Sequence, residues 1–165
     1  MVIDATGTAV ICQRAGIPTE VGENYLSYVT HEMNKADADA LSETGDFCRA
    51  RRWRKTGSDI WGNEDNQVPE NTVGSFGDFR KKGRRFQLPY TTLYSSKAPN
   101  IYAAGRIISA KGEGWEITRV IPVAAHSGQV AGTAAALCLK TNADAVTLDV
   151  KLLQETLKAQ GVLFK

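Results

Sequence analysis

Two short apolar runs, near opposite ends of the chain, each end at a glycine beside a polar residue. The first is Val2–Gly7 (Val-Ile-Asp-Ala-Thr-Gly) and the second is Ile101–Arg106 (Ile-Tyr-Ala-Ala-Gly-Arg). An apolar run that stops at a glycine is typical of a buried strand whose backbone closely approaches another group, because glycine tolerates positive φ and has no side chain. We therefore expect two buried strands whose ends lie against something else.

A long stretch of small residues, Pro122–Leu139, follows the second run and predicts a helix with a slim profile. Alanines and glycines recur throughout it: Ala124, Ala125, Gly128, Ala131, Gly132, Ala135 and Ala136. Pro122 suits the first turn of a helix, where its missing N–H costs little. A slim helix can lie close to a sheet or to a flat ligand, so Gly128 and Gly132 have two interpretations: plain helix-on-sheet packing, or a ligand beside the helix.

Weaker patterns predict the elements of the first half. Residues 8–15 are expected to form a short helix, ended by a left-handed Gly16. Residues 24–29 have the aromatic and β-branched content of a strand. Residues 35–52 permit a helix, whereas residues 56–85 are polar, with isolated apolar anchors, and predict a long loop or insertion.

The second half has clearer boundaries. Residues 86–93 predict an edge strand, because Pro89 cannot donate to a ladder. Residues 110–116 are expected to be a flexible loop with two glycines. A last helix begins after Asp149 as N-cap and ends at Gly161 as C-cap. Its predicted apolar stripe is Val150, Leu153 and Leu157.

Size and composition predict one soluble domain in the cytoplasm. The chain has 165 residues, 42% of them hydrophobic, and a formal net charge of +2. That length is normally a single domain, and the small net charge does not imply a polyanionic partner. No segment resembles a signal peptide or a membrane span. The three cysteines, Cys12, Cys48 and Cys138, are scattered and are interpreted as reduced thiols.

Basic stretches and histidines have functional alternatives that we consider weaker. Residues 49–55 and 80–85 concentrate arginine and lysine, which favours phosphate contacts, but nearby acidic residues make a solvated face the preferred interpretation. We therefore expect no nucleic-acid partner. His126 could face a ligand as a proton donor, although a half-buried packing role is the preferred interpretation. No metal-ligand spacing or nucleophilic triad stands out.

Five segments taken in order resemble a known family. They are Val2–Gly7, Leu88–Leu93, Asn100–Ser109, Thr118–Pro122 and Gly128–Leu137. Their order resembles the carboxy-terminal part of FAD-dependent oxidoreductases of the glutathione-reductase-like superfamily, closest to a bacterial group distantly related to fumarate reductase flavoproteins. The resemblance is scattered over residues 1–20 and dense over 86–163. It implies an FAD-dependent oxidoreductase that passes a hydride through its flavin.

The resemblance also implies which residues face the cofactor. They are Ala5, Thr6, Gly7, Gly105, Arg106, Arg119, Ile121, Pro122 and Val123. In this family the Ala-Thr-Gly segment lies beside the adenosine and pyrophosphate, and the residue at the position of Arg106 lies near the ribityl chain. A helix N-terminus carries about half a positive charge, which suits the carbonyl of a flavin ring. This sequence departs from the family's pattern at two of these positions or beside them. Thr8 stands where relatives have aspartate, and Arg106 stands where relatives have an acidic residue.

A larger departure is the glycine-rich phosphate turn. No GxGxxG follows a predicted strand, and that turn holds the FAD pyrophosphate on a helix N-terminus. We therefore expect a truncated or split gene product that binds FAD weakly or not at all by itself. Its open strand edge calls for a homo-oligomer or a separate nucleotide-binding chain.

The expected fold is α/β or α+β: an incomplete, Rossmann-like FAD-binding flavoprotein fragment with a small-residue helix packed on a short sheet. Residues 1–165 form one domain, in which 1–20 and 86–165 resemble a cofactor domain and 21–85 an insertion or substrate domain. The expected function is that of a carboxy-terminal fragment of an FAD-dependent oxidoreductase, inactive or dependent on a partner. The alternative is a non-enzymatic oligomerising module, a flavoprotein remnant without cofactor. No residue pattern identifies a substrate or a catalytic acid or base.

Overall fold

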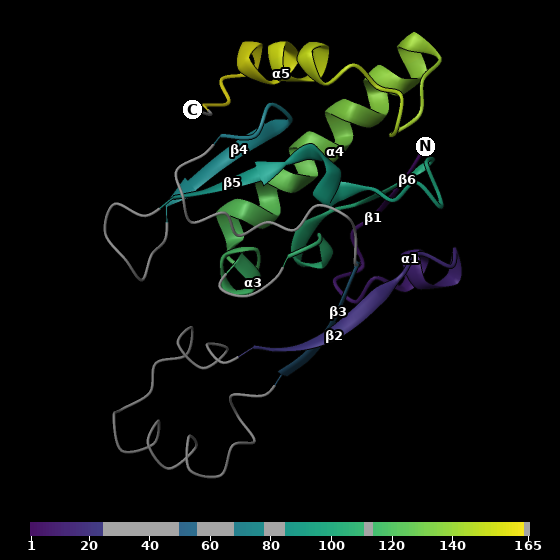
Figure 1. The fold of residues 1–165 in the computed structure, drawn as a ribbon, viewed down its shortest axis with the longest axis vertical. Coiled ribbons are helices and arrows are strands. Elements are labelled where there is room, and N and C mark those ends of the chain that lie inside the picture. The colour runs from purple at the N-terminus through teal and green to yellow at the C-terminus, as the bar shows by residue number, and fades with distance from the viewer. Residues whose placement is uncertain (25–49, 56–67, 78–84, 111–113, 164–165) are drawn as a thin grey trace.

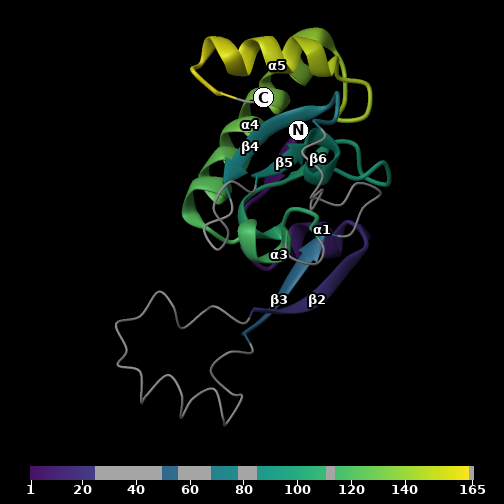
Figure 2. The same ribbon diagram turned by 60° about the vertical axis from the view of Figure 1, so that its left-hand side comes forward.

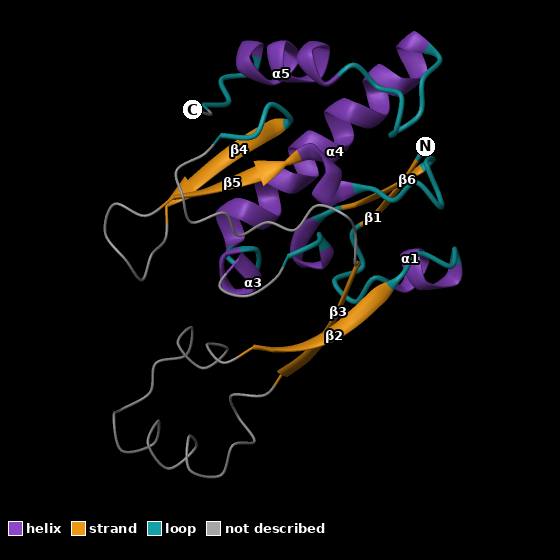
Figure 3. Ribbon diagram, viewed as in Figure 1, coloured by secondary structure: helices purple, strands orange, loops and turns teal. Residues whose placement is uncertain are grey.

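The computed structural model describes residues 1–24, 50–55, 68–77, 85–110 and 114–163 (Figure 1). In this part of the chain, strands pair two by two and helices pack around them (Figure 3). Two views place the last helix at one end of the molecule and the β2–β3 pair at the other (Figures 1 and 2). The mixture of helices and small sheets confirms the predicted α/β class.

The two glycine-ended runs form adjacent parallel strands. β1 (Val2–Asp4) pairs with β6 (Ile101–Ala103), so that Asp4 lies opposite Ala103. Within the described residues no further strand pairs with β1. The side chains of Val2 and Ile3 are 41% and 38% exposed. Because successive side chains of a strand point to opposite faces, both faces of β1 are partly open to solvent.

A hairpin replaces part of the loop expected over residues 56–85. β4 (Thr72–Gly77) pairs antiparallel with β5 (Arg85–Pro89), and the 3₁₀ helix η2 (Tyr90–Leu93) follows directly. The expectation was therefore wrong for residues 72–77. It was also wrong for the end of the strand predicted over 86–93, which turns into η2 after Pro89. Residues 56–67 and 78–84 lie outside the described part of the chain.

Burial explains why the polar-looking segment forms a strand. Phe76 lies opposite Phe86, and Gly74 lies opposite Leu88. Phe86 and Leu88 are fully buried, as is Val73 on β4. Cross-strand apolar pairs of this kind stabilise a hairpin, although the sequence of β4 alone contains two glycines and a serine that disfavour a strand.

A second antiparallel pair is formed by β2 (Thr19–Asn24) and β3 (Ala50–Lys55). The helix permitted over residues 35–52 is therefore wrong for residues 50–52, which pair with residues 22–24. Pairing along the whole of β2 outweighs the weak helix propensity of this segment. The rest of that helix, and all but the first residue of the strand predicted over 24–29, lie outside the described residues.

The helices match the stronger sequence patterns. α1 (Val10–Arg14) lies within the predicted 8–15 and is followed by Gly16 with φ +72°. α4 (Ile121–Thr141) contains the predicted 122–139, and α5 (Val150–Ala159) begins after Asp149, whose carboxylate accepts from Lys151 N. α3 (Gly114–Ile117) is a short helix in the region predicted to be a loop, because Trp115 and Ile117 are buried there.

One side of α4 packs on the hairpin and on α5, and the main core lies between them (Figures 1 and 3). A chain of buried hydroxyls crosses this core. Tyr90 donates its only hydroxyl hydrogen to Ala145 O at 2.9 Å, so it accepts from Tyr102, whose oxygen lies 2.5 Å away. The Tyr102 hydroxyl in turn accepts from the Cys138 thiol at 3.4 Å. Burial raises the pKa of both tyrosines, and both stay protonated. The chain links β6, η2, α4 and the turn before α5.

Candidate functional site

The segments after β1 and β6 leave the small parallel sheet at the same edge. Asp4 is the last residue of β1 and lies opposite Ala103, the last residue of β6. Ala104 N donates to Asp4 O at 2.9 Å, which extends the ladder by one bond. The carboxyl edge of a parallel sheet is where ligands bind in open α/β folds. Both predicted loops, 5–7 and 104–106, therefore start at this edge.

A buried carboxylate, which the sequence analysis did not single out, shapes the first loop. Asp4 is fully buried, and its two oxygens accept from Thr6 N at 3.0 Å, Thr6 Oγ1 at 2.7 Å and Cys12 N at 2.9 Å. Burial alone would raise the pKa of Asp4, but the hydrogen bonds from Cys12 and Thr6 outweigh it and lower the pKa. An acidic residue inside an apolar strand was the available signal.

Of the predicted cofactor-contacting residues in this loop, Thr6 is engaged in hydrogen bonds within the loop, whereas Ala5 and Gly7 are accessible to a ligand. The Thr6 hydroxyl donates to Asp4 and accepts from Val10 N at 3.1 Å, and its N–H is also bound to Asp4. Thr6 therefore organises the loop. Ala5 is exposed, and Gly7 has φ +75° with open space where a Cβ would lie. A ligand could therefore come close to the backbone of this loop at Ala5 and Gly7.

The second loop is fixed to α4 by a serine that the sequence analysis did not single out. Gly105, with φ +77°, donates its N–H to Ser127 Oγ at 2.8 Å, and Ser127 donates to Ala124 O at 2.8 Å. A Cβ at Gly105 would meet open space. Arg106 follows in η3 (Gly105–Ile107) and is exposed. A lone serine among small residues was the signal that could have revealed this contact.

The start of α4 carries the remaining predicted residues. Within the described part of the chain, no side chain caps α4 at Val120. Ile121 is 84% exposed and Pro122 is exposed, whereas the side chain of Val123 is buried in the core. Arg119 is partly buried in the turn between α3 and α4. The partial positive charge of a 21-residue helix thus lies at a surface that side chains of Ile121 and Pro122 border.

One stripe of α4 is open to solvent along its whole length. Its exposed residues include Ile121, Ala125, Gly128, Ala136 and Leu139, and Leu139 is 73% exposed. A Cβ at Gly128 or at Gly132 would meet no atom within 4 Å. The predicted slim profile of the helix is confirmed, but its two glycines do not pack on any described residue. Plain helix-on-sheet packing therefore does not account for them.

His126 faces the hairpin and supports the packing interpretation. Its Nε2 lies 2.7 Å from Val73 O, and its ring packs on Phe76 with centroids 5.2 Å apart. A Cβ at Gly74 would lie 2.6 Å from Nε2. Burial lowers the pKa of His126, although the bond to Val73 O opposes that shift. Because adjacent helix residues point about 100° apart, His126 and Ser127 serve different faces of α4.

The described residues contain neither a metal-ligand cluster nor a helix that could span a membrane. In the described ranges no three His, Cys, Asp or Glu side chains gather as metal ligands would. No helix there combines the length and apolarity that crossing a bilayer requires. Cys12 and Cys138 are buried and form no disulfide, as predicted for reduced thiols, and Cys48 lies outside the described residues.

Comparison with known proteins finds one family. The family model described as FAD dependent oxidoreductase matches residues 59–157, more than half of the chain. No curated protein and no solved structure matches the chain significantly. The matched segment contains the β4–β5 hairpin, β6 with the Gly105 loop, and all of α4.

Proposed function

The chain belongs to the FAD-dependent oxidoreductase family, and we propose that it forms the flavin-facing part of such an enzyme, of the glutathione-reductase-like kind. One observation carries the proposal: the uncapped start of α4 and the positive-φ Gly105 are joined through Ser127, and open space lies at Gly105. The buried thiols of Cys12 and Cys138, which form no disulfide, support a reducing, cytoplasmic setting.

The described residues fit a flat, partly anionic ring at this place. The first N–H groups of α4 supply hydrogen-bond donors and positive potential, and Ile121, Pro122 and Val123 carry that backbone. Gly105 permits close approach because it has no side chain. Arg119 supplies a fixed charge to the flavin or to an anionic substrate, and Arg106 contacts hydroxyl or phosphate oxygens.

The loop after β1 fits through its backbone. Ala5 and Gly7 lie at the same edge of the sheet as Gly105 and are open to approach. Thr6 keeps the loop in shape through Asp4. We place the adenosine and pyrophosphate side of FAD against Ala5, Thr6 and Gly7. When bound, FAD supplies a hydride acceptor and donor at flavin N5, and the chain supplies position and electrostatics.

The proposed site is tested by placing a negative charge at the start of α4. Ile121→Asp changes an exposed side chain, and an acid in the first turn stabilises a helix by about 0.3–1 kcal/mol. The same charge repels an anionic flavin carbonyl. We therefore expect a saturable quench of FAD fluorescence by the purified chain, weakened about tenfold in the variant, while the melting temperature does not fall.

The matched control is Leu139→Asp, which adds the same charge at the far, exposed end of α4, about 27 Å away at 1.5 Å per residue. Its FAD binding should equal that of the unchanged chain. Equal weakening by both substitutions, or no saturable quench at about 1 mM FAD, rejects the site at the start of α4.

The alternative, a non-enzymatic oligomerising module, is favoured by the open stripe of α4. Gly128 and Gly132 face open space, and the neighbouring β1 exposes apolar side chains on both faces. A second copy of the chain or a separate nucleotide-binding chain would cover such a surface. FAD binding distinguishes the two functions. A chain that oligomerises without binding FAD supports the alternative, whereas FAD binding that Ile121→Asp weakens supports the oxidoreductase. In either case the chain by itself is expected to be catalytically silent.

A further inference from the structure

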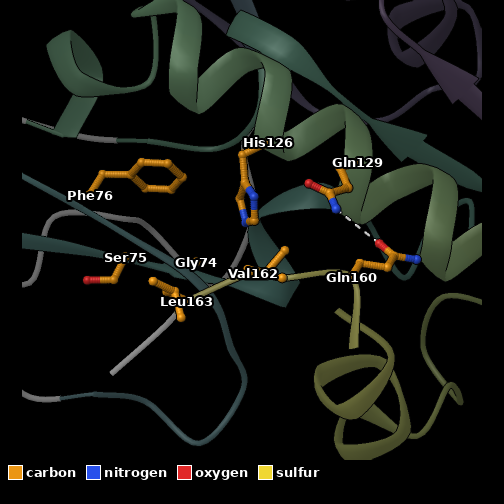
Figure 4. A pocket seen from close by; sticks show the side chains of 9 residues that line it. Gly74, Ser75, Phe76, His126, Gln129, Gln160, Val162 and Leu163 are labelled. Atoms are coloured by element: carbon orange, nitrogen blue, oxygen red, sulfur yellow. Dashed lines mark hydrogen bonds between the residues drawn. The ribbon is translucent and has the colours of Figure 1, made fainter. Parts of the chain in front are cut away.

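A pocket lies on the hairpin side of α4, between β4 and the segment that follows α5 (Figure 4). Its volume is about 250 Å³, which suits a molecule of one ring. The lining residues are Gly74, Ser75, Phe76, His126, Gln129, Gln160, Gly161, Val162 and Leu163. None of them belongs to the site proposed for FAD.

The His126 ring presents a hydrogen-bond acceptor. Val73 O can only accept, so the Nε2 atom 2.7 Å away must carry the proton. In the neutral imidazole Nδ1 then holds a lone pair. Among the described residues no donor is bound to it. Burial keeps the pKa of His126 below its usual value, which favours this neutral form.

Gln129 presents a second acceptor beside the first. Its Nε2 donates to Gln160 Oε1 at 3.0 Å, and the same oxygen accepts from Thr133 at 3.3 Å, which fixes both amides. The Gln129 oxygen is therefore the free end of its amide. Figure 4 shows this oxygen on the side of Gln129 that faces His126. Residues three apart on a helix are neighbours, so the two acceptors lie together.

The opposite wall supplies apolar contacts. Ser75 Oγ accepts from Gln87 Nε2 at 3.2 Å, and Figure 4 shows its hydroxyl pointing away from His126. Phe76, Val162 and Leu163 provide apolar surface, and none of the described residues that line the pocket is charged. A carboxylate would face two lone pairs, and an ammonium group would lose water without meeting a negative charge.

We propose that this pocket binds a small, neutral aromatic carboxamide, whose amide N–H groups donate to His126 Nδ1 and Gln129 Oε1. The aromatic ring packs against Phe76, Val162 and Leu163. The pocket is independent of FAD, because His126 and Ser127 direct their side chains to different faces of α4.

Three ligands of similar shape test whether the pocket prefers a neutral ligand that carries N–H donors: benzamide, benzoate and benzylamine. The signals of ¹⁵N-labelled histidine in the full chain report on Nδ1 directly, and His31 is the only other histidine. Benzamide should shift the His126 Nδ1 signal saturably, with a dissociation constant of the order of 1–10 mM for so small a ligand. Benzoate and benzylamine should bind at least about fivefold more weakly, the effect of one lost hydrogen bond.

Gln129→Leu removes one acceptor at an exposed position and should weaken benzamide about fivefold. Lys140→Gln, exposed on the last turn of the same helix, is the control and should bind benzamide as the unchanged chain does. The proposal is overturned by the absence of a saturable shift, by charged probes that bind as well as benzamide, or by unchanged binding in Gln129→Leu.

Discussion

At the scale of single residues, two polar groups decide the local structure: the buried Asp4 and the partly buried His126. Asp4 holds the loop after β1 through three hydrogen bonds, and His126 holds β4 through the Val73 carbonyl. Folding lowers the pKa of both groups and so favours the deprotonated form of each. For Asp4 that form is the charged carboxylate, whereas for His126 it is the neutral imidazole. Both contributions to stability are present at neutral pH and are lost in acid, over different pH ranges.

Replacing Asp4 should destabilise the chain and remove one acid transition. Asp4→Asn places an amide N–H₂ where donors from Thr6 and Cys12 point, which costs about 1–3 kcal/mol. In the unchanged chain the contribution of Asp4 is present above its unfolded pKa of 3.8 and is lost as pH falls through the lower folded pKa. Urea unfolding between pH 3 and 7 measures both effects. Equal stability of the two chains at pH 7 would contradict the role of Asp4.

His126 should contribute an earlier acid transition. The neutral ring is favoured in the folded chain, so stability is complete above the unfolded pKa of 6.5 and falls as pH decreases below it. His126→Gln retains an N–H donor for Val73 O but does not titrate, so its unfolding free energy should vary less between pH 7 and 5. Denaturant titrations of both chains provide the measurement, and identical pH slopes would contradict the assignment.

At the scale of elements, close contact between β4 and α4 explains why a glycine-containing segment forms a strand. Gly74 lies under the His126 ring, and a side chain at that position would overlap it. The sequence pattern of β4 disfavours a strand, but packing on α4 and pairing with β5 outweigh that propensity. The hairpin thus depends on contacts between residues far apart in the chain.

Gly74→Ala should therefore destabilise the chain by about 1–3 kcal/mol, because its Cβ would lie 2.6 Å from His126 Nε2. Gly77→Ala, in the same strand with open space at its Cβ, is the matched control and should change stability little. Combining Gly74→Ala with His126→Ala should restore part of the loss. A purely additive double variant, measured by thermal unfolding, would show that the two residues do not couple.

At the scale of the whole molecule, one face is packed and another is open. The packed face joins α4 to the hairpin and to α5, where Gln154 also binds Glu70 O and Thr72 O at 2.7 and 2.8 Å. Elsewhere, the stripe of α4 through Gly128 and Gly132 is open to solvent, and so are Val2 and Ile3 on β1. We propose that a partner covers these open surfaces.

Gly128→Leu should affect the stability of the monomer and its assembly in opposite directions. Because the position is helical and open, the substitution should raise the stability of a monomer by about 0.5–1 kcal/mol through helix propensity. In an assembly that uses the stripe, the added side chain blocks close approach. Light scattering should then show an oligomer for the unchanged chain and a monomer for the variant. Glu155→Leu, exposed on α5, is the control; a monomeric unchanged chain would contradict homo-oligomerisation.

The sequence by itself determined the elements whose signals are local. The small-residue helix, the Asp149 cap of α5 and the two glycine-ended strands depend on residues within a few positions of one another, and those segments also carry the family resemblance. Tertiary structure alone decided the hairpin at β4, the burial of Asp4, the tie between Ser127 and Gly105, and the face of α4 that stays open. The reason is physical: these features arise from burial and hydrogen bonds between segments distant in sequence, which outweigh local propensity.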